Sequence, residues 1–246
     1  MKITTRLELD QHLKQLGIKA GRNLVVHGRL ISFGRCLAED VLDTLQSGIG
    51  PDATLVVPTY VFGAEEPYDP IRTKPTGMGA LSELVWRSSN SVRSFNPVHS
   101  HCGLGPLAKE LLSTSILSSF GEDTDFAWML DHDFDLLLLG CGFSQGGTFL
   151  HHLEKLIDVP YRASVPSPKQ IVINETIEEI PFRYFARQDD KVQENFDCIL
   201  PALQGHYQIA AAPYGNSILI SLKTLARVGL SLLRNNPYFL VDVHNS

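Results

Sequence analysis

Near the N-terminus, the pattern of apolar and polar positions predicts a helix followed by alternating strands and helices. Residues 4–16 place leucines at helical spacing and end at Gly17, which predicts a first helix. Short apolar runs at 23–27 and 53–58 predict two buried strands. Residues 37–47, between the two runs, have helical spacing. This order is typical of an α/β protein.

The middle of the chain carries one long irregular stretch between further short elements. Residues 61–77 are rich in proline, glycine and charge, which predicts a long surface loop of the kind that often has a function. Helices are expected at 78–88, 106–113 and 124–130, the second opened by a proline. The apolar run 136–139 predicts a third buried strand.

After Pro160 the pattern changes toward β structure. Residues 167–180 predict a hairpin or edge pair, with 182–185 as its next strand. Amphipathic helices are expected at 189–203 and 221–234. With no repeat, linker or low-complexity segment, we expect one α/β domain with a small β-rich elaboration in its C-terminal half.

Composition and charge narrow the classes of function. The 246 residues are 43% hydrophobic and 20% charged, as in an ordinary globular protein. The net charge is 21 − 27 = −6. An acidic protein is a poor general nucleic-acid binder, and its charge suits a cationic substrate.

The cysteines and the N-terminus indicate the compartment. Four cysteines are scattered without a CxxC pair, which predicts neither a disulfide framework nor a zinc site. The first residues are polar and amphipathic, unlike a signal peptide, and no apolar run reaches the length of a membrane span. We therefore expect a cytoplasmic protein without a membrane partner.

The most informative segment is 136–154, LLLLGCGFSQGGTFLHHLE. It predicts a strand, a glycine-rich loop and a helix start, with Thr148 as the N-cap. His151 and Glu154 are three residues apart and share one helix face, whereas His152 points elsewhere. Glu154 would hold the imidazole in one tautomer and leave its other nitrogen as a general base. Spacing alone also fits an ordinary surface pair, but the glycines favour close approach of a ligand.

Other segments offer chemistry that the residues alone leave open. The loop 27–34 follows a strand and precedes a helix, a standard place for phosphate, and a plain connection fits as well. Residues 72–79 would clamp an anion or form a capped loop. A metal site would need His99 or His101 beside His151, and no spacing demands it.

These segments resemble, in order, those of the aminoglycoside 3-N-acetyltransferase family. Family stretches written HSSLSSFG, GTLVMPT, FDP-RTPT-GMG, RS-HP--S-AA-G and LLLGVG…NTSLHLAE are similar to residues 27–34, 53–59, 68–79, 93–105 and 137–154. The similarity continues weakly to the C-terminus and covers nearly the whole chain. Each motif is modest alone, and the ordered set is specific.

The resemblance implies a single domain over 1–246 with a central mixed β-sheet flanked by helices, distinct from the GNAT acetyltransferases. It implies acetyl-coenzyme A as donor, an amine of an amino sugar as acceptor, and no metal. The family's histidine and glutamate fall on His151 and Glu154, with Thr148 beside them. The implied cofactor contacts are His27, Arg29, Ser32, Phe33, Gly34, Thr76, Met78 and Gly79. The acceptor contacts are assigned to Asp69, Arg72, His99 and Ser100.

Three departures from the family pattern leave alternatives open. The usual serine pair is Gly28-Arg29, the usual histidine before the proline is Asn96, and the usual asparagine before Thr148 is Gly147. The acceptor is then an antibiotic or an amino sugar of a polysaccharide or natural-product pathway. A non-catalytic descendant that binds sugar or coenzyme is the alternative to an enzyme. Transfer through Cys102 or Cys141 is the alternative mechanism. The oligomeric state is open, with a homodimer among the options.

Overall fold

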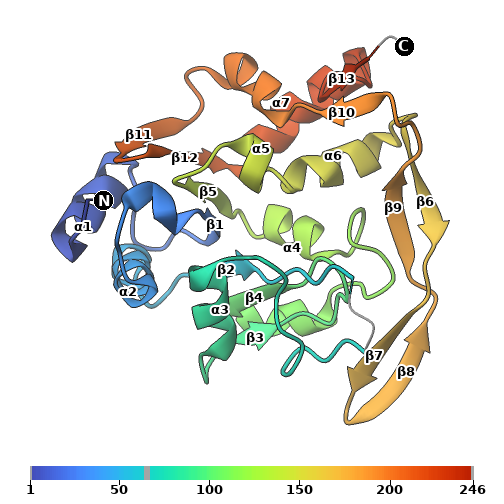
Figure 1. Cartoon of the computed structure of the whole chain (residues 1–246), viewed down its shortest axis with the longest axis horizontal. Helices are drawn as coiled ribbons and strands as arrows, with labels where there is room; N and C mark the ends of the chain where they lie inside the picture. The colour runs from blue at the N-terminus through green and yellow to red at the C-terminus, as the bar shows by residue number, and fades with distance from the viewer. Residues whose placement is uncertain (1, 64–66, 245–246) are drawn as a thin grey trace.

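The computed structural model describes residues 2–63 and 67–244. Within them, seven strands form a central sheet in the order β11-β12-β5-β1-β2-β4-β3 (Figure 1). Their bounds are β1 Leu24–Gly28, β2 Leu55–Pro58, β3 Val92–Arg93, β4 His101–Leu104, β5 Asp135–Leu139, β11 Gln208–Ala212 and β12 Gly215–Ser221. β5, β1 and β2 are parallel, and the strands outside them are antiparallel. The expected mixed central sheet is confirmed.

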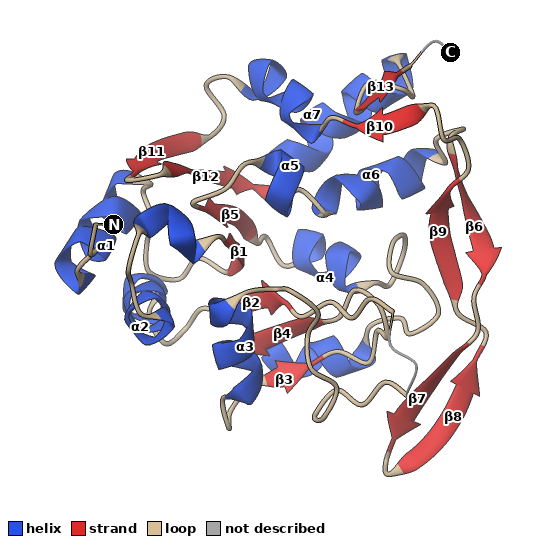
Figure 2. Ribbon diagram, viewed as in Figure 1, coloured by secondary structure: helices blue, strands red, loops and turns tan. Residues whose placement is uncertain are grey.

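Helices cover both faces of this sheet (Figure 2). One face carries α1 Arg6–Gln15, α2 Ala38–Ile49 and α3 Ala80–Arg87, and the other carries α4 Asp125–Asp131, α6 Phe149–Ile157 and α7 Leu222–Asn235. Successive strand residues point to opposite faces. Leu136 and Leu138 therefore join one core, and Leu137 and Leu139 join the other.

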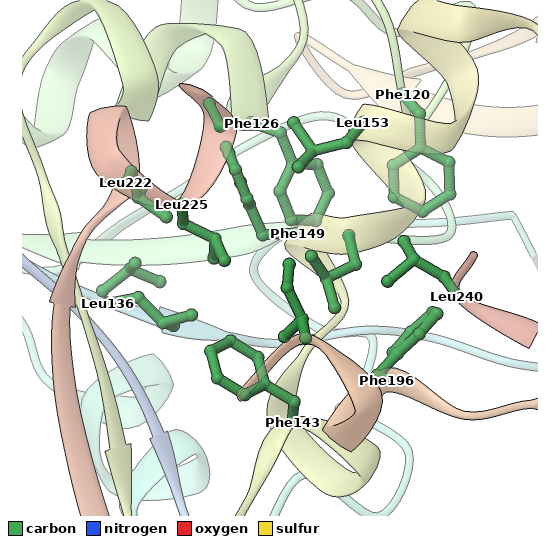
Figure 3. Packing of buried hydrophobic residues seen from close by; sticks show 14 of the residues in the cluster. Phe120, Phe126, Leu136, Phe143, Phe149, Leu153, Phe196, Leu222, Leu225 and Leu240 are labelled. Carbon is green, nitrogen blue, oxygen red and sulfur yellow. The ribbon is translucent and has the colours of Figure 1, made fainter. Parts of the chain in front are cut away.

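The helix α6 is held tightly against its neighbours (Figure 3). Phe149 and Leu153 on α6 are fully covered and belong to the same core as Phe126 of α4. The α7 helix approaches so closely that a Cβ added at Gly229 would lie 2.5 Å from Leu153 Cδ1. Close packing of this kind leaves α6 little freedom to move. It fixes the direction in which the opposite face of the helix points.

Three two-stranded sheets form the β-rich part of the C-terminal half. They pair β6 Arg162–Pro166 with β9 Arg183–Arg187, β7 Lys169–Ile173 with β8 Thr176–Ile180, and β10 Val192–Glu194 with β13 Val241–Val243. The β7–β8 hairpin is confirmed, and it turns at Asn174 and Glu175, both at positive φ. The expectation that 182–185 continues the hairpin is wrong, because β9 pairs with β6. Phe182, which lies between β8 and β9 in the chain, is buried in one cluster with Ile171 and Ile180.

Several local expectations are corrected by tertiary contacts. The amphipathic pattern at 189–203 is not one helix, since β10 pairs with β13 and a 3₁₀ helix with an internal proline follows at Phe196–Leu203. Residues 106–113 form a 3₁₀ helix, Ala108–Ser113, and the 27–34 loop contains another, Leu30–Phe33. Part of the glycine loop is a short helix, α5 Phe143–Gly146. The edge strand β11 and its neighbour β12 were not expected.

The helix boundaries are otherwise close to those expected. α1, α2, α3, α4 and α7 lie where the apolar spacing predicts them, and Ser221 caps α7. The prediction that Thr148 caps α6 is wrong, because its backbone is helical and its side chain makes no capping bond. None of the helices among the described residues combines the length and apolar character needed to cross a membrane.

Candidate active site

A pocket of about 320 Å³ lies beyond the carboxyl ends of the parallel strands β1, β2 and β5. This edge of an α/β sheet is where such folds usually bind ligands. The pocket is lined by His27, Tyr60, Phe62, Met78, His99, Phe120, Gln145, Thr148, His151, Arg162, Tyr184, Phe185 and Glu194. These residues come from the sheet ends, from α6 and from the outer ribbons, so only the completed fold assembles them.

His151 reaches the pocket from the first turn of α6 and pairs with Glu154 behind it. Nδ1 of His151 lies 2.6 Å from Oε2 of Glu154, as the spacing of three predicts. The imidazole is 16% exposed and rests edge-on against Phe196, with 4.9 Å between the ring centroids. When Nδ1–H donates to the carboxylate, Nε2 is left with its lone pair. The arrangement therefore presents a base to the pocket.

Glu154 is fully buried and is kept ionised by three neighbours. The Tyr161 hydroxyl donates to its Oε1 over 2.7 Å, and Arg162 Nε lies 3.0 Å from Oε2. Burial alone would raise the pKa of Glu154, but the hydrogen bond and charge of His151, the charge of Arg162 and the Tyr161 bond outweigh it, so the pKa lies below its ordinary value. Arg162 Nε is an ion-pair partner without hydrogen-bond alignment.

A second carboxylate, Glu194 of β10, lies on the open side of His151. Its Oε1 is 3.9 Å from Nε2 of His151 and accepts a hydrogen bond from Arg162. Glu194 is 43% exposed, so solvent and ligands reach it. Arg162 thus contacts both carboxylates that flank the His151 imidazole, Glu154 and Glu194. Neither Arg162 nor Glu194 was expected from the sequence, because long-range strand pairing brings them to the pocket.

A buried chain of polar groups approaches the pocket from the other side. His101 Nδ1 lies 2.9 Å from Oδ2 of Asp125, and Nε2 lies 3.2 Å from the Tyr60 hydroxyl. In the tautomer whose Nδ1–H donates to the carboxylate, Nε2 accepts a hydrogen bond from the Tyr60 hydroxyl. Burial raises the pKa of Tyr60 far above its ordinary value, opposed by a hydrogen bond from Thr148. The chain therefore fixes Tyr60 as a protonated wall of the pocket.

Five residues assigned from the sequence line this pocket, namely His27, Met78, His99, Thr148 and His151. The His99 ring is held by a 2.8 Å hydrogen bond between Nδ1 and the Ser119 hydroxyl. Its burial, followed by the charges of His151, His101 and Arg162, lowers its pKa well below the ordinary value. His152 does not line the pocket, in keeping with the expectation that it points elsewhere; it is buried, and its Nδ1 accepts the Gly121 N–H.

The other residues assigned to the 27–34 loop either connect this loop to the glycine-rich loop or fix its own conformation. Arg29 donates to the Ser32 hydroxyl over 3.1 Å, and that hydroxyl donates to the Gly140 carbonyl over 2.6 Å. Phe33 is buried against the His12 ring. Gly34 adopts φ 78°, and an added Cβ would lie 2.2 Å from Lys2 O. These contacts position the exposed Arg29 at the end of β1.

The residues assigned to the 61–77 loop, and the assigned Gly79 and Ser100, lie outside the pocket lining. Asp69 accepts the backbone N–H groups of Ile71 and Arg72, and the Arg72 side chain is 88% exposed. Thr76 bonds to the Phe62 backbone, and Gly79 precedes α3 at φ 85°. Ser100 is fully buried and donates to Thr59 O. The structure brings none of these five to the pocket lining.

The two cysteines of the alternative mechanism are poor nucleophiles. Cys141 is buried and its Sγ lies 3.4 Å from the His27 carbonyl. Burial raises the pKa of the Cys141 thiol to about 11, and burial also raises that of Cys102. Both remain thiols near neutral pH. Over residues 2–63 and 67–244, no three His, Cys, Asp or Glu side chains form a group that could hold a metal ion.

Comparison with known proteins identifies the family. The family model for aminoglycoside 3-N-acetyltransferase matches residues 25–234. Aminoglycoside N(3)-acetyltransferase IV of Salmonella sp is 32% identical over 161 residues, which are 63% of this chain and 60% of that protein. The match therefore spans less than two thirds of that relative's length.

Solved structures share the fold. AAC-IIIb in a binary complex with CoASH superposes with a TM-score of 0.84 at 21% identity, over 95% of this chain and 97% of that one. AAC-VIa bound to sisomicin superposes with a TM-score of 0.81 at 16% identity, over 95% and 98% of the two chains. At these identities the likeness concerns the arrangement of helices and strands.

Proposed function

The chain belongs to the aminoglycoside 3-N-acetyltransferase family, and from that membership we propose that it transfers the acetyl group of acetyl-coenzyme A to an amine of an aminoglycoside or related amino sugar. The observation that carries the proposal is the pairing of His151 with a buried, ionised Glu154 inside a pocket at the sheet ends. The CoASH and sisomicin complexes of the two structural relatives support the donor and acceptor classes.

His151 acts as the general base in the proposed reaction. A sugar amine is largely protonated near neutral pH, so a proton must leave before or during attack on the thioester. Nε2 of His151 receives that proton, and Glu154 stabilises the imidazolium that forms. The proton then passes to the departing thiolate. Transfer is direct, since the buried thiols of Cys102 and Cys141 lack the thiolate that an acetyl-enzyme would need.

A carboxylate on the open side of the pocket suits a cationic acceptor. Glu194 lies beside Nε2 of His151 and is open to solvent. A carboxylate in this position attracts the other ammonium groups of a polyamine sugar and orients one amine toward the base. His99 also lines the pocket. Asp69, Arg72 and Ser100 act at most indirectly on the acceptor.

The coenzyme enters along the loop that follows β1. Arg29 and the end of the loop at Gly34 would meet its phosphates, while Met78 lines the pocket where the thioester arrives. Ser32, Phe33, Thr76 and Gly79 shape this path through their packing and backbone bonds. This division places the anionic part of the donor outside the pocket and its acetyl group inside.

The test is thiol release from acetyl-coenzyme A across a panel of aminoglycosides and simple or nucleotide-linked amino sugars. We expect release with at least one class, which also separates an antibiotic from a biosynthetic acceptor. Calorimetry with acetyl-coenzyme A runs alongside. Binding without thiol release on any amine would favour a non-catalytic protein, and parallel-line kinetics with a covalent acetyl-enzyme would favour a cysteine route.

A further inference from the structure

His27 is a buried polar side chain in the pocket whose hydrogen-bonding capacity is unused. It lies one residue before the end of β1, and it is 8% exposed. It lines the same pocket as His151 and Thr148. Across the described ranges, no hydrogen bond joins its ring to another group of the chain. Buried polar groups without partners are rare, and one that faces a pocket is available to a ligand.

The imidazole of His27 is neutral at any pH where the protein would work. Burial, and after it the charge of the nearby His101, lowers its pKa to about 3. A neutral imidazole keeps one N–H donor and one acceptor nitrogen. It therefore offers a hydrogen bond inside the pocket without the positive charge that would repel an ammonium group. His151, with its carboxylate partner, has the contrasting role of a base.

The position of His27 is fixed by the sheet. Its backbone pairs with Leu138 of β5, and its carbonyl accepts the Cys141 thiol. Gly146 packs against it so closely that an added Cβ would lie 2.9 Å from the His27 Cβ. The ring stands edge-on to Tyr60, with 6.3 Å between centroids. A donor on a rigid strand keeps its direction during a reaction.

Acyl transfer needs donors for the oxygen that becomes negative, and the glycine loop has few to spare. Gly140 N–H donates to the Ser217 hydroxyl, and Gly142 N–H to the Gln145 side chain. Asp197 accepts the N–H groups of Phe143 and Ser144. The N–H groups of Gly146 and Gly147 close the turns of α5. These six N–H groups are therefore already bonded within the protein.

We propose that His27 donates a hydrogen bond to the carbonyl oxygen of the bound thioester and stabilises the oxyanion of the tetrahedral intermediate. This inference rests on the proposed acetyl transfer. The amine lone pair forms the new C–N bond, and the carbonyl π pair moves onto oxygen, where the N–H of His27 meets it. The amine proton goes to Nε2 of His151. The C=O then re-forms, the C–S bond breaks, and the thiolate takes the proton from His151.

The test compares His27→Leu, which removes the donor, with His27→Asn, which keeps an N–H. An oxyanion donor is typically worth about 10²–10³ in kcat. We expect a loss of that size in His27→Leu, partial recovery in His27→Asn, and little change in the affinity for acetyl-coenzyme A. A kcat for His27→Leu within about threefold of the wild type would overturn the inference.

A spectroscopic readout on the unmodified protein covers the case in which the variants fold poorly. The carbonyl stretch of ¹³C-labelled acetyl-coenzyme A should move to lower frequency on binding, because a hydrogen bond weakens the C=O bond. An unshifted band in the wild type would also overturn the inference. A shifted band without thiol release on any amino sugar would contradict the proposed acceptor class and leave His27 in its role. Turnover with an unshifted band would contradict the role of His27 and leave the proposed acceptor class in place.

Discussion

Nδ1 of His151 and Oε2 of Glu154 are 2.6 Å apart on one face of α6, and the carboxylate of this pair is fully buried. The bond selects the tautomer and the ring orientation of His151. It also couples the proposed base to the protein interior, because Glu154 is itself held by Tyr161 and Arg162. Changes behind the imidazole are therefore expected to reach the reaction.

Replacing His151 with alanine should remove most of the turnover while acetyl-coenzyme A still binds. A general base contributes about 10²–10⁴ to the rate, and kcat should fall by that factor. Thiol release measures the rate, and calorimetry measures the binding. The exposed His206, changed to alanine, serves as the control and should stay at the wild-type rate. Near-normal turnover in the His151 variant would remove His151 from the role of base.

Replacing Arg162 with glutamine should destabilise the protein, because Glu154 loses a countercharge while staying buried. Breaking a buried ion pair typically costs about 3 kcal/mol in the free energy of unfolding. Urea denaturation measures the cost. The double variant with Glu154→Gln should recover part of it, since a neutral amide tolerates burial better. A double variant no more stable than Arg162→Gln alone would contradict the pairing.

The same pair has a pH signature. The pKa of Glu154 is lowered in the folded state, so its contribution to stability is full above the unfolded value, about 4.3, and is lost as the pH falls through the lower folded pKa. In Arg162→Gln the folded pKa rises toward the unfolded one, and that acid-dependent contribution should shrink. The free energy of unfolding of the wild type and of Arg162→Gln, measured at a series of pH values below about 4.5, tests this difference.

Buried histidines should make the protein lose stability as the pH falls from about 6.5 toward 4. Burial lowers the pKa of four of them, His12, His27, His99 and His152, with His27 at about 3 and His152 at about 4. The unfolded chain then binds more protons than the folded one, which favours unfolding, by up to about 1.4 kcal/mol per pH unit for each group.

Denaturation at a series of pH values tests this slope. The buried His152, changed to leucine, should give a smaller slope than the wild type between about pH 6.5 and 4. The exposed His206, changed to glutamine, should leave the slope as it is. Equal slopes in all three proteins would exclude buried imidazoles as the cause.

Gly146→Ala should destabilise the protein, whereas Gly48→Ala should not. At Gly146 the new Cβ would lie 2.6 Å from Leu138 Cδ2 and 2.9 Å from the His27 Cβ, and overpacking of this kind costs about 1–3 kcal/mol. At Gly48, inside α2, the nearest atom is 3.4 Å away, and alanine should stabilise the helix by about 0.5–1 kcal/mol. Melting temperatures of the two variants measure the contrast, and equal shifts would contradict it.

Replacing Glu194 with glutamine should raise KM for the acceptor and leave the affinity for acetyl-coenzyme A unchanged. The carboxylate is partly exposed, so we expect a change of about two- to fivefold, smaller at high salt. Glu178→Gln removes the same charge from the exposed β8 strand and is the matched control. If both variants raise KM equally, the effect is one of net charge and not of position.

The sequence predicts this site to the extent that the site is local. The His151–Glu154 pair follows from helical spacing alone, and the strands at 23–27, 53–58 and 136–139 follow from short apolar runs. The ordered motifs then identify the family. The single-domain expectation and the individual site roles stay predictions.

What the sequence does not reveal depends on pairing between distant strands. Arg162 and Glu194 enter the pocket through β6 and β10, whose partners lie far along the chain. Residues 196–203 have the apolar content of a helix, but Pro201 and the β10–β13 pair shorten it to a 3₁₀ turn. The motif suggests that Ser100 is a site residue. Only the fold shows that Ser100 is buried and donates a hydrogen bond to the Thr59 carbonyl.

The two walls of the pocket have different origins. The two histidines proposed to act in the reaction, His27 and His151, stand on the central sheet and on a tightly packed helix, whereas Tyr184 and Glu194 stand on separate two-stranded ribbons. Substitutions on the ribbons can change which amine fits while the sheet and α6 keep their packing. In evolution, the range of acceptors is therefore free to drift faster than the chemistry, and relatives of this chain need not share a substrate to share a reaction.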